Sequence, residues 1–118
     1  MVNVNNINNN KYQQNYRAPT FIEPVRSVDA QVGSTVVFEC ILYGEPTPYV
    51  TWEHNGIEIC EGDSLSDSTS KHQLYRLTLR HVQPSDCGEY ACKARNQSGE
   101  ATSVADLCIY LDQQQHGK

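Results

Sequence analysis

Apolar residues recur at every second position over several short stretches of the chain. In the longest of these, Val36, Phe38, Cys40 and Leu42 alternate with a second set of residues at 35, 37, 39 and 41. The same alternation marks the stretches 50–53, 75–80, 90–95 and 105–110. Because successive side chains of a strand point to opposite faces, each stretch predicts a strand with one face in a core and the other toward water.

Turn-forming residues separate these stretches. Gly, Pro, Asn and Asp cluster at 44–46, 55–56, 61–63, 84–86 and 98–99, and such clusters punctuate strands. No segment keeps the 3.6-residue period of an amphipathic helix. Many short strands with regular turns predict an all-β domain, either a sandwich or a barrel.

The two ends of the chain differ in composition from the middle. Residues 3–17 are polar and rich in Asn and Gln, and residues 113–118 are similar. Such segments bury too little apolar surface to offset their ordering entropy. We therefore predict a disordered leader or linker at 1–18, one folded domain at 19–112 and a flexible tail at 113–118. A spacer role for the leader is favoured over an aggregation-prone or partner-binding tail.

Length and charge exclude several classes of protein. The chain has 118 residues, with 14 acidic and 9 basic side chains and a formal net charge of −5. This length fits a single domain. The acidic balance argues against nucleic-acid binding, which needs a basic surface. No apolar run approaches the ~20 residues that a membrane helix needs, so we expect no membrane insertion.

One group of residues favours the sandwich over the barrel. Cys40 and Cys92 are predicted to face inward from different strands, and Trp52 follows Cys40 on the next strand. The run from Asp86 through Gly88 and Tyr90 to Cys92 reads Asp-x-Gly-x-Tyr-x-Cys. This order matches a tyrosine corner that leads into an inward-facing cysteine.

On these residues the sequence resembles an immunoglobulin domain of the intermediate (I-set) kind. The resemblance also includes Gly33, residues 44–52, Asn55-Gly56, Leu77-x-Leu79 and Ala94-x-Asn96-x-x-Gly99. It implies a two-sheet Greek-key β-sandwich with Cys40, Trp52 and Cys92 at its centre and Leu77 in the core. The Cys40–Cys92 pair would be either a disulfide or two buried thiols, which behave as small hydrophobes.

Catalytic chemistry has little support in the sequence. It contains no Gly-x-Ser-x-Gly, His-Glu-x-x-His or phosphate-loop motif. The four histidines, at 54, 72, 81 and 116, are scattered and do not fall at metal-ligand spacing, so we interpret them as solvated surface side chains. The sequence thus predicts no enzyme activity, no metal, no cofactor and no small-molecule substrate.

Asn96-Gln97-Ser98 is a glycosylation sequon on the tip of a predicted hairpin. A turn needs Asn or Gly at this place with or without a glycan, so we favour turn chemistry as the role of Asn96.

Three of the five cysteines, Cys60, Cys87 and Cys108, lie outside the core pair. Counting register from the hairpin tip sets Cys87 opposite Cys108 on the outer face, which allows a second disulfide. The alternative is two or three free thiols, and spare thiols favour a reducing compartment.

By resemblance, the chain is similar to I-set domains of titin, twitchin and obscurin-type muscle proteins. It would be a structural, protein-binding module of a cytoplasmic sarcomeric or cytoskeletal protein. Its partners would be other proteins, first of all neighbouring domains of the parent chain. Such sandwiches resist tension when their A′ and G strands pair in parallel. Candidate contact surfaces are the hairpin at 96–99 and the strand edge near 21–26.

Two other functions remain open from the sequence. An extracellular adhesion or receptor domain would explain the sequon and the core cysteine pair, whereas the spare thiols count against it. A position beside a kinase domain is known for intracellular relatives, and nothing in these residues tests it.

Overall fold

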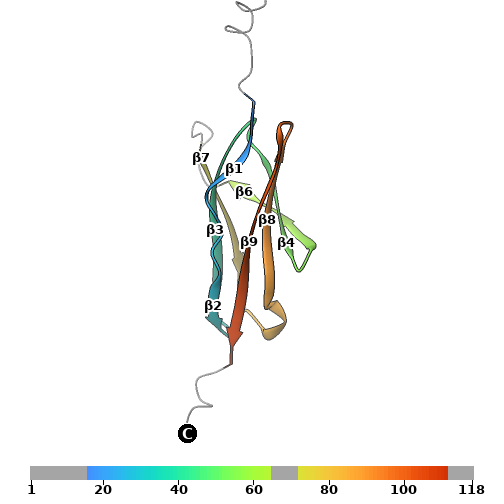
Figure 1. Cartoon of the computed structure of the whole chain (residues 1–118). Coiled ribbons are helices and arrows are strands. Elements are labelled where there is room, and N and C mark those ends of the chain that lie inside the picture. Colours follow the sequence, from blue (N-terminus) through green and yellow to red (C-terminus); the bar gives the residue numbers. More distant parts are fainter. Residues whose placement is uncertain (1–15, 65–71, 112–118) are drawn as a thin grey trace, which may run out of the picture.

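A computed structural model describes residues 16–64 and 72–111 of the chain (Figure 1). This part of the chain forms nine strands and one short 3-10 helix. In chain order they are β1 (Arg17–Glu23), β2 (Val28–Gln31), β3 (Val36–Glu45), β4 (Tyr49–His54), β5 (Ile57–Glu61), β6 (Asp63–Ser64), β7 (His72–Leu79), η1 (Pro84–Asp86), β8 (Gly88–Asn96) and β9 (Gly99–Tyr110).

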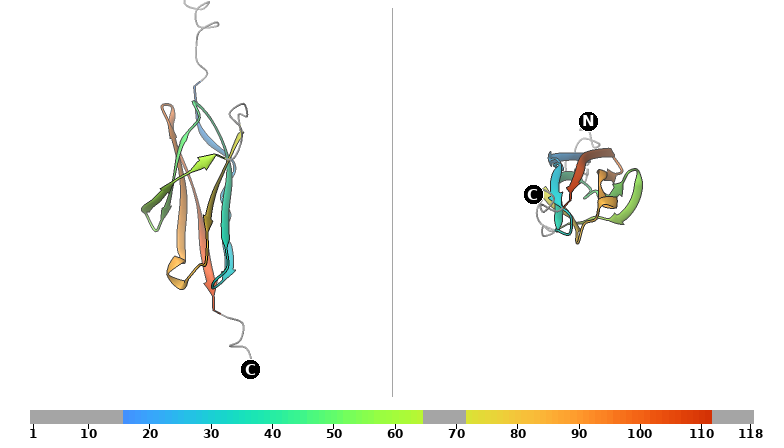
Figure 2. Two further views of the ribbon diagram at one scale, coloured as in Figure 1. Left: turned by 180° about the vertical axis from the view of Figure 1, so that it is seen from behind. Right: turned by 90° about the horizontal axis from the view of Figure 1, so that it is seen from below.

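The strands form two sheets that face each other, as the view along the strands shows (Figure 2). One sheet has the order β1-β3-β7-β6 and the other has the order β2-β9-β8-β4-β5. The chain crosses between the layers from β1 to β2, β2 to β3, β3 to β4, β5 to β6 and β7 to β8, and it does not form a simple meander. The predicted all-β, two-sheet Greek-key sandwich is confirmed.

The two-residue alternation of the sequence is the alternation of burial in the structure. On β3, Val36, Phe38, Cys40 and Leu42 are buried, whereas the residues between them are exposed or half-buried. β7 pairs with β3 in antiparallel register and sets Tyr75 opposite Cys40. The inward residues of both strands thus meet the inward residues of the opposite sheet.

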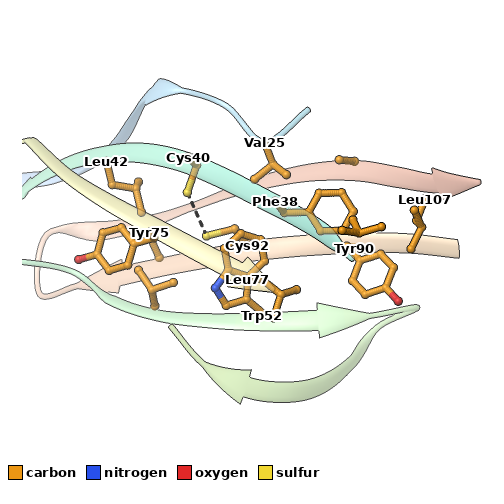
Figure 3. Packing of buried hydrophobic residues seen from close by; sticks show 14 of the residues in the cluster. Val25, Phe38, Cys40, Leu42, Trp52, Tyr75, Leu77, Tyr90, Cys92 and Leu107 are labelled. Carbon is orange, nitrogen blue, oxygen red and sulfur yellow. Dashed lines mark hydrogen bonds between the residues drawn. The ribbon is translucent and has the colours of Figure 1, made fainter. Parts of the chain in front are cut away.

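The core lies between the sheets along their whole length (Figure 3). Trp52 is completely buried at its centre, beside the two sulfur atoms of Cys40 and Cys92. The largest other buried side chains come from both sheets and from the segment between β7 and η1: Phe38, Leu42, Val50, Val82, Tyr90 and Leu107. A core of this kind supplies most of the stability of a domain of this size.

The hairpin between β4 and β5 shows how the turn residues act. Asn55 has φ 52° and Gly56 has φ 86°. A two-residue hairpin turn of type I′ needs positive φ at both positions, which Asn-Gly adopts at low cost. The turn predicted at Asn55-Gly56 is confirmed.

The folded part begins slightly earlier than the predicted boundary at residue 19. β1 starts at Arg17, which pairs with Glu45 of β3. The rest of the predicted leader, residues 1–15, and the predicted tail lie outside the described residues. Within 16–64 and 72–111, no helix has the length and apolar character needed to cross a lipid bilayer.

Candidate functional site

The two core cysteines are in contact as thiols. The sulfur atoms of Cys40 and Cys92 are 3.6 Å apart, and both side chains are almost fully buried (Figure 3). The hydrogen bond with Cys40 and, to a lesser extent, burial raise the pKa of the Cys92 thiol. Because the thiolate is the reactive form, burial and this raised pKa disfavour reaction of Cys92 in the folded domain.

The predicted tyrosine corner is present. The Tyr90 hydroxyl donates a hydrogen bond of 2.6 Å to the backbone carbonyl of Asp86. The Asp86 carboxylate in turn accepts a hydrogen bond of 2.7 Å from the backbone N–H of Gln83. This bond caps the N-terminus of the short helix η1. Burial, reinforced by Asp86 and Cys87, raises the pKa of Tyr90 to about 12. Tyr90 and Asp86 thus fix the entry into β8, while Leu77 lies in the core as expected.

Gly88 is required here for two reasons. Its φ of +131° is rarely adopted by residues with a side chain. A Cβ at this position would also lie 2.5 Å from Oδ1 of Asn55. That oxygen accepts a hydrogen bond of 2.9 Å from the backbone N–H of Glu89. The glycine lets the β4–β5 turn dock on the start of β8.

His54 is not the solvated surface side chain that the sequence analysis expected. Its ring stacks on Tyr90 with centroids 4.3 Å apart and an interplanar angle of 7°. Its Nε2 makes a hydrogen bond of 2.8 Å with the backbone carbonyl of Cys87. The sequence does contain a signal for this position. His54 lies two residues after the buried Trp52 on the same strand, so both side chains point to the same face of the sheet.

Asn96 joins three elements at one end of the sandwich. Its side-chain Nδ2 donates to the backbone carbonyl of Arg17 at 2.7 Å and to that of Pro46 at 2.9 Å. Its Oδ1 accepts from the backbone N–H of Ser98 at 2.8 Å. Since a glycan is attached through this same nitrogen, glycosylation would replace a hydrogen that Asn96 uses in the folded domain. The geometry agrees with turn chemistry as the role of Asn96.

The three cysteines outside the core are distributed over one sheet. Cys60 is exposed on β5, Cys108 is exposed on β9, and Cys87 is half-buried between η1 and β8. The β8–β9 ladder runs from Asn96 opposite Gly99 to Gly88 opposite Leu107. This is the register predicted from the hairpin, and the ladder ends one residue short of Cys87 and Cys108.

The surfaces predicted for protein contacts are accessible. Gln97 and Ser98 at the tip of the β8–β9 hairpin are exposed. β1 is the edge of its sheet. Beside it lies a groove of about 500 Å³, whose lining includes Glu23, Arg26, Val37, Ile41, Leu74 and Arg76.

A further edge, which the sequence analysis did not single out, is β5. Every residue of this strand is exposed, and Ile57 keeps 71% of its surface open to solvent. Unpaired strand edges are places where another chain can add a strand.

No group of three His, Cys, Asp or Glu side chains that could hold a metal occurs within the described ranges. Charge is instead arranged in single pairs on the surface, such as Arg76 with Glu39 and Lys93 with Glu53. Exposed pairs of this kind add little to stability.

The first and last parts of the domain meet in a parallel pair. β2 pairs with β9 from Val28 opposite Leu107 to Gln31 opposite Tyr110. The backbone N–H of Val32 extends this pairing with a 2.9 Å bond to the carbonyl of Tyr110. Within the described residues, the chain enters through β1 at one end of the sandwich and leaves through β9 at the other (Figure 1). The parallel pair expected from the resemblance is thus present between the two ends.

Comparisons with known proteins agree with this geometry. A smooth-muscle myosin light chain kinase of Gallus gallus is 35% identical over 92 residues, which cover 78% of this chain and 5% of the kinase. A fast-type myosin-binding protein C of Gallus gallus is 37% identical over 98 residues, 81% of this chain and 8% of that protein. The chain therefore spans only a small fraction of these curated relatives.

Solved structures give the same result. The titin domains z1z2, crystallised in complex with telethonin, superpose with a TM-score of 0.73 at 33% identity, covering 83% of this chain and 50% of that one. The family described as immunoglobulin I-set domain matches residues 19–109. The chain belongs to the immunoglobulin I-set domain family.

Proposed function

We propose that this chain is a non-enzymatic structural and protein-binding module of a larger intracellular muscle or cytoskeletal protein. The support is its family, together with relatives that are muscle proteins many times its length. Its partners would be proteins, first of all neighbouring domains of the same parent chain. A titin relative forms a complex with telethonin, and the open edges of β1 and β5 offer similar opportunities for protein contacts here.

The observation that carries this proposal is the parallel pairing of β2 with β9. Tension applied to the two ends of the domain pulls β2 and β9 past each other along their own axes. Their hydrogen bonds run across the strands, so the bonds are loaded together instead of one after another. Such an arrangement resists extension, as a link in a chain of domains must.

The direction of the backbone N–H groups on β2 gives a sharp test. The N–H of Val32 bonds to Tyr110 of β9. Because N–H groups alternate sides along a strand, the N–H of Ala30 also faces β9, whereas that of Asp29 faces away. Proline has no N–H. Ala30→Pro therefore removes a hydrogen bond between β2 and β9. Asp29→Pro is the matched control, because it introduces a proline into the same strand without removing a bond to β9.

The whole chain, held through peptide tags at its two ends, would be pulled in single-molecule force spectroscopy. We expect Ala30→Pro to unfold at a lower force than the parent at equal loading rate, and Asp29→Pro to unfold at nearly the parental force. Urea unfolding of both variants separates this effect from a general loss of stability. Equal unfolding forces for the two variants would remove the support for a load-bearing role.

A cytoplasmic location is part of the same proposal. To test this location, protein isolated from its source tissue would be digested, and the peptide that contains Asn96 would be analysed by mass spectrometry. We expect Asn96 to be unmodified. A glycan on Asn96 would instead favour the extracellular adhesion domain. The bonds from Asn96 Nδ2 to Arg17 and Pro46 are the reason for expecting none.

A further inference from the structure

Two cysteines that the core does not use lie at the open end of the β8–β9 hairpin. Cys87 immediately precedes β8, and Cys108 lies near the end of β9. Both are free thiols in the structure. We propose that Cys87 and Cys108 form a reversible disulfide that closes the hairpin and shortens the length of chain that the domain releases under tension.

The register sets the two residues opposite each other. The last pair of the ladder is Gly88 with Leu107, and the next step in the same register is Cys87 with Cys108. Cys87 has φ −59° and ψ 156°, which is an extended conformation. The chain is therefore extended at Cys87, and Gly88, with φ +131°, joins this residue to β8.

The backbone of Cys87 indicates which kind of cross-strand pair this is. Its carbonyl accepts from Nε2 of His54 on β4 at 2.8 Å, and the carbonyl of Glu89 accepts from the N–H of Asn55 at 2.8 Å. The carbonyls of Cys87 and Glu89 thus both point toward the β4 side, away from β9. Cys87 with Cys108 is accordingly a non-hydrogen-bonded pair.

This kind of pair suits a disulfide. Directly opposite residues in non-hydrogen-bonded pairs have Cα atoms about 4.5 Å apart, and their side chains are closer than in the alternate pairs. A disulfide needs a Cα separation of about 4.4–6.8 Å. A bridge between Cys87 and Cys108 therefore needs side-chain rotation rather than movement of the sheet.

Both side chains belong to the outer face of the sheet. Glu89 and Asp106, the pair two steps nearer the hairpin tip on this face, are both exposed. Cys108 is exposed and Cys87 is half-buried. Of these two thiols, Cys108 is therefore the first that an oxidant reaches, and Cys87 is the resolving thiol.

The oxidant we name is glutathione disulfide. The Cys108 thiolate attacks one sulfur of glutathione disulfide, forms a mixed disulfide and releases one glutathione thiolate. The Cys87 thiolate then attacks the Cys108 sulfur of the mixed disulfide and releases the second. The two protein thiols are oxidised to one disulfide, glutathione disulfide is reduced to two glutathione molecules, and these take up the two protons.

The bridge would change how far the domain extends. Cys87 and Cys108 enclose 20 residues, which include most of β8 and β9. When the bridge is closed, these residues cannot be stretched out after unfolding. At about 3.3–3.6 Å per residue, the gain in contour length falls by about 70 Å. The thiol chemistry itself does not depend on whether the domain bears load in the cell.

The test uses the folded whole chain in buffers of increasing glutathione disulfide to glutathione ratio, followed by acid quenching, alkylation and peptide mapping. Cleavage after Glu89 separates Cys87 from Cys92, and cleavage after Lys93 separates both peptides from Cys108. We expect a cross-linked pair of peptides that contain Cys87 and Cys108, with two fewer alkylated thiols. Reducing buffer should restore both thiols.

Matched variants make the result specific. Cys60→Ser should form the same bridge, whereas Cys87→Ser and Cys108→Ser should not. Oxidised parent protein in the force experiment should show the shorter contour-length gain, and Cys108→Ser should keep the full gain.

Two outcomes would overturn the inference. One is a stable glutathione adduct on Cys108 while Cys87 stays alkylated. The other is a Cys40–Cys92 disulfide with both outer thiols unchanged. Circular dichroism of each serine variant checks that it has folded.

Discussion

Asn96 offers the most discriminating test of how this end of the sandwich is held. Asn96→Ala removes two donated hydrogen bonds, to Arg17 and Pro46, and one accepted from Ser98. Each such bond adds about 0.5–1.5 kcal/mol net. Asn96 is only half-buried, so water partly replaces the lost partners. We expect a loss of about 2 kcal/mol, a sizeable share of the ~5–15 kcal/mol typical of a domain.

The assay is urea unfolding followed by the fluorescence of Trp52, the single tryptophan of the chain. The midpoint should fall at nearly unchanged slope. The melting temperature should fall by roughly 8–16 °C, at about 4–8 °C per kcal/mol. Asn96→Asp should lose at least as much at neutral pH, because its carboxylate would face the two carbonyl oxygens that Asn96 Nδ2 now bonds.

Ser98→Ala is the matched control for Asn96. It destroys the glycosylation sequon but keeps the Asn96 side chain and the Ser98 backbone N–H, so its stability should be parental within about 0.5 kcal/mol. If Asn96→Ala and Ser98→Ala were equally stable, the three hydrogen bonds would not hold this end together, and our reason for expecting no glycan would fail.

Two further predictions concern the core and the tyrosine corner. Trp52→Ala should cost about 3–5 kcal/mol by circular dichroism, because it leaves a large cavity; a loss within ~1 kcal/mol would contradict a central position. Tyr90→Phe should cost about 1–2 kcal/mol through loss of the bond to Asp86. Since the pKa of Tyr90 is raised to about 12, whereas an unfolded tyrosine ionises near pH ~10, its contribution is complete below about pH 10 and is lost as the pH rises toward 12. Urea unfolding across this range should show a shallower decline for Tyr90→Phe than for the parent, and identical declines would refute the assignment.

Local regularity explains which parts of the fold were predictable. Alternation is a property of an extended backbone, so β3 could be assigned from Val36 to Leu42 without knowledge of its neighbours. Turn residues act in the same local way, which is why Asn55-Gly56 was assigned correctly. The spacing of Cys40, Trp52 and Cys92 then selected the sandwich.

The prediction for His54 was wrong for a related reason. A polar residue near the end of a strand is usually exposed, and its preference for the surface says nothing about which side chain lies beside it. In the structure the imidazole covers the ring of Tyr90, which lies 36 positions away in the chain. Only the packing of β4 on β8 brings the two rings together.

The sequence by itself determined strands β3, β4, β7, β8 and β9, the inward cysteines and tryptophan, the tyrosine corner and the register of the β8–β9 hairpin. Each of these depends on a short-range period or on a turn of two residues. The tertiary structure alone decided that Asn96 binds Arg17 and Pro46, which precede it by 79 and 50 positions. It also decided which residues of β2 and β9 meet in the parallel pair, from Val28 opposite Leu107 to Gln31 opposite Tyr110, where the sequence offered only a family resemblance. These contacts form only when both sheets have packed, because burial of the shared core sets the distances between segments that are far apart in the chain.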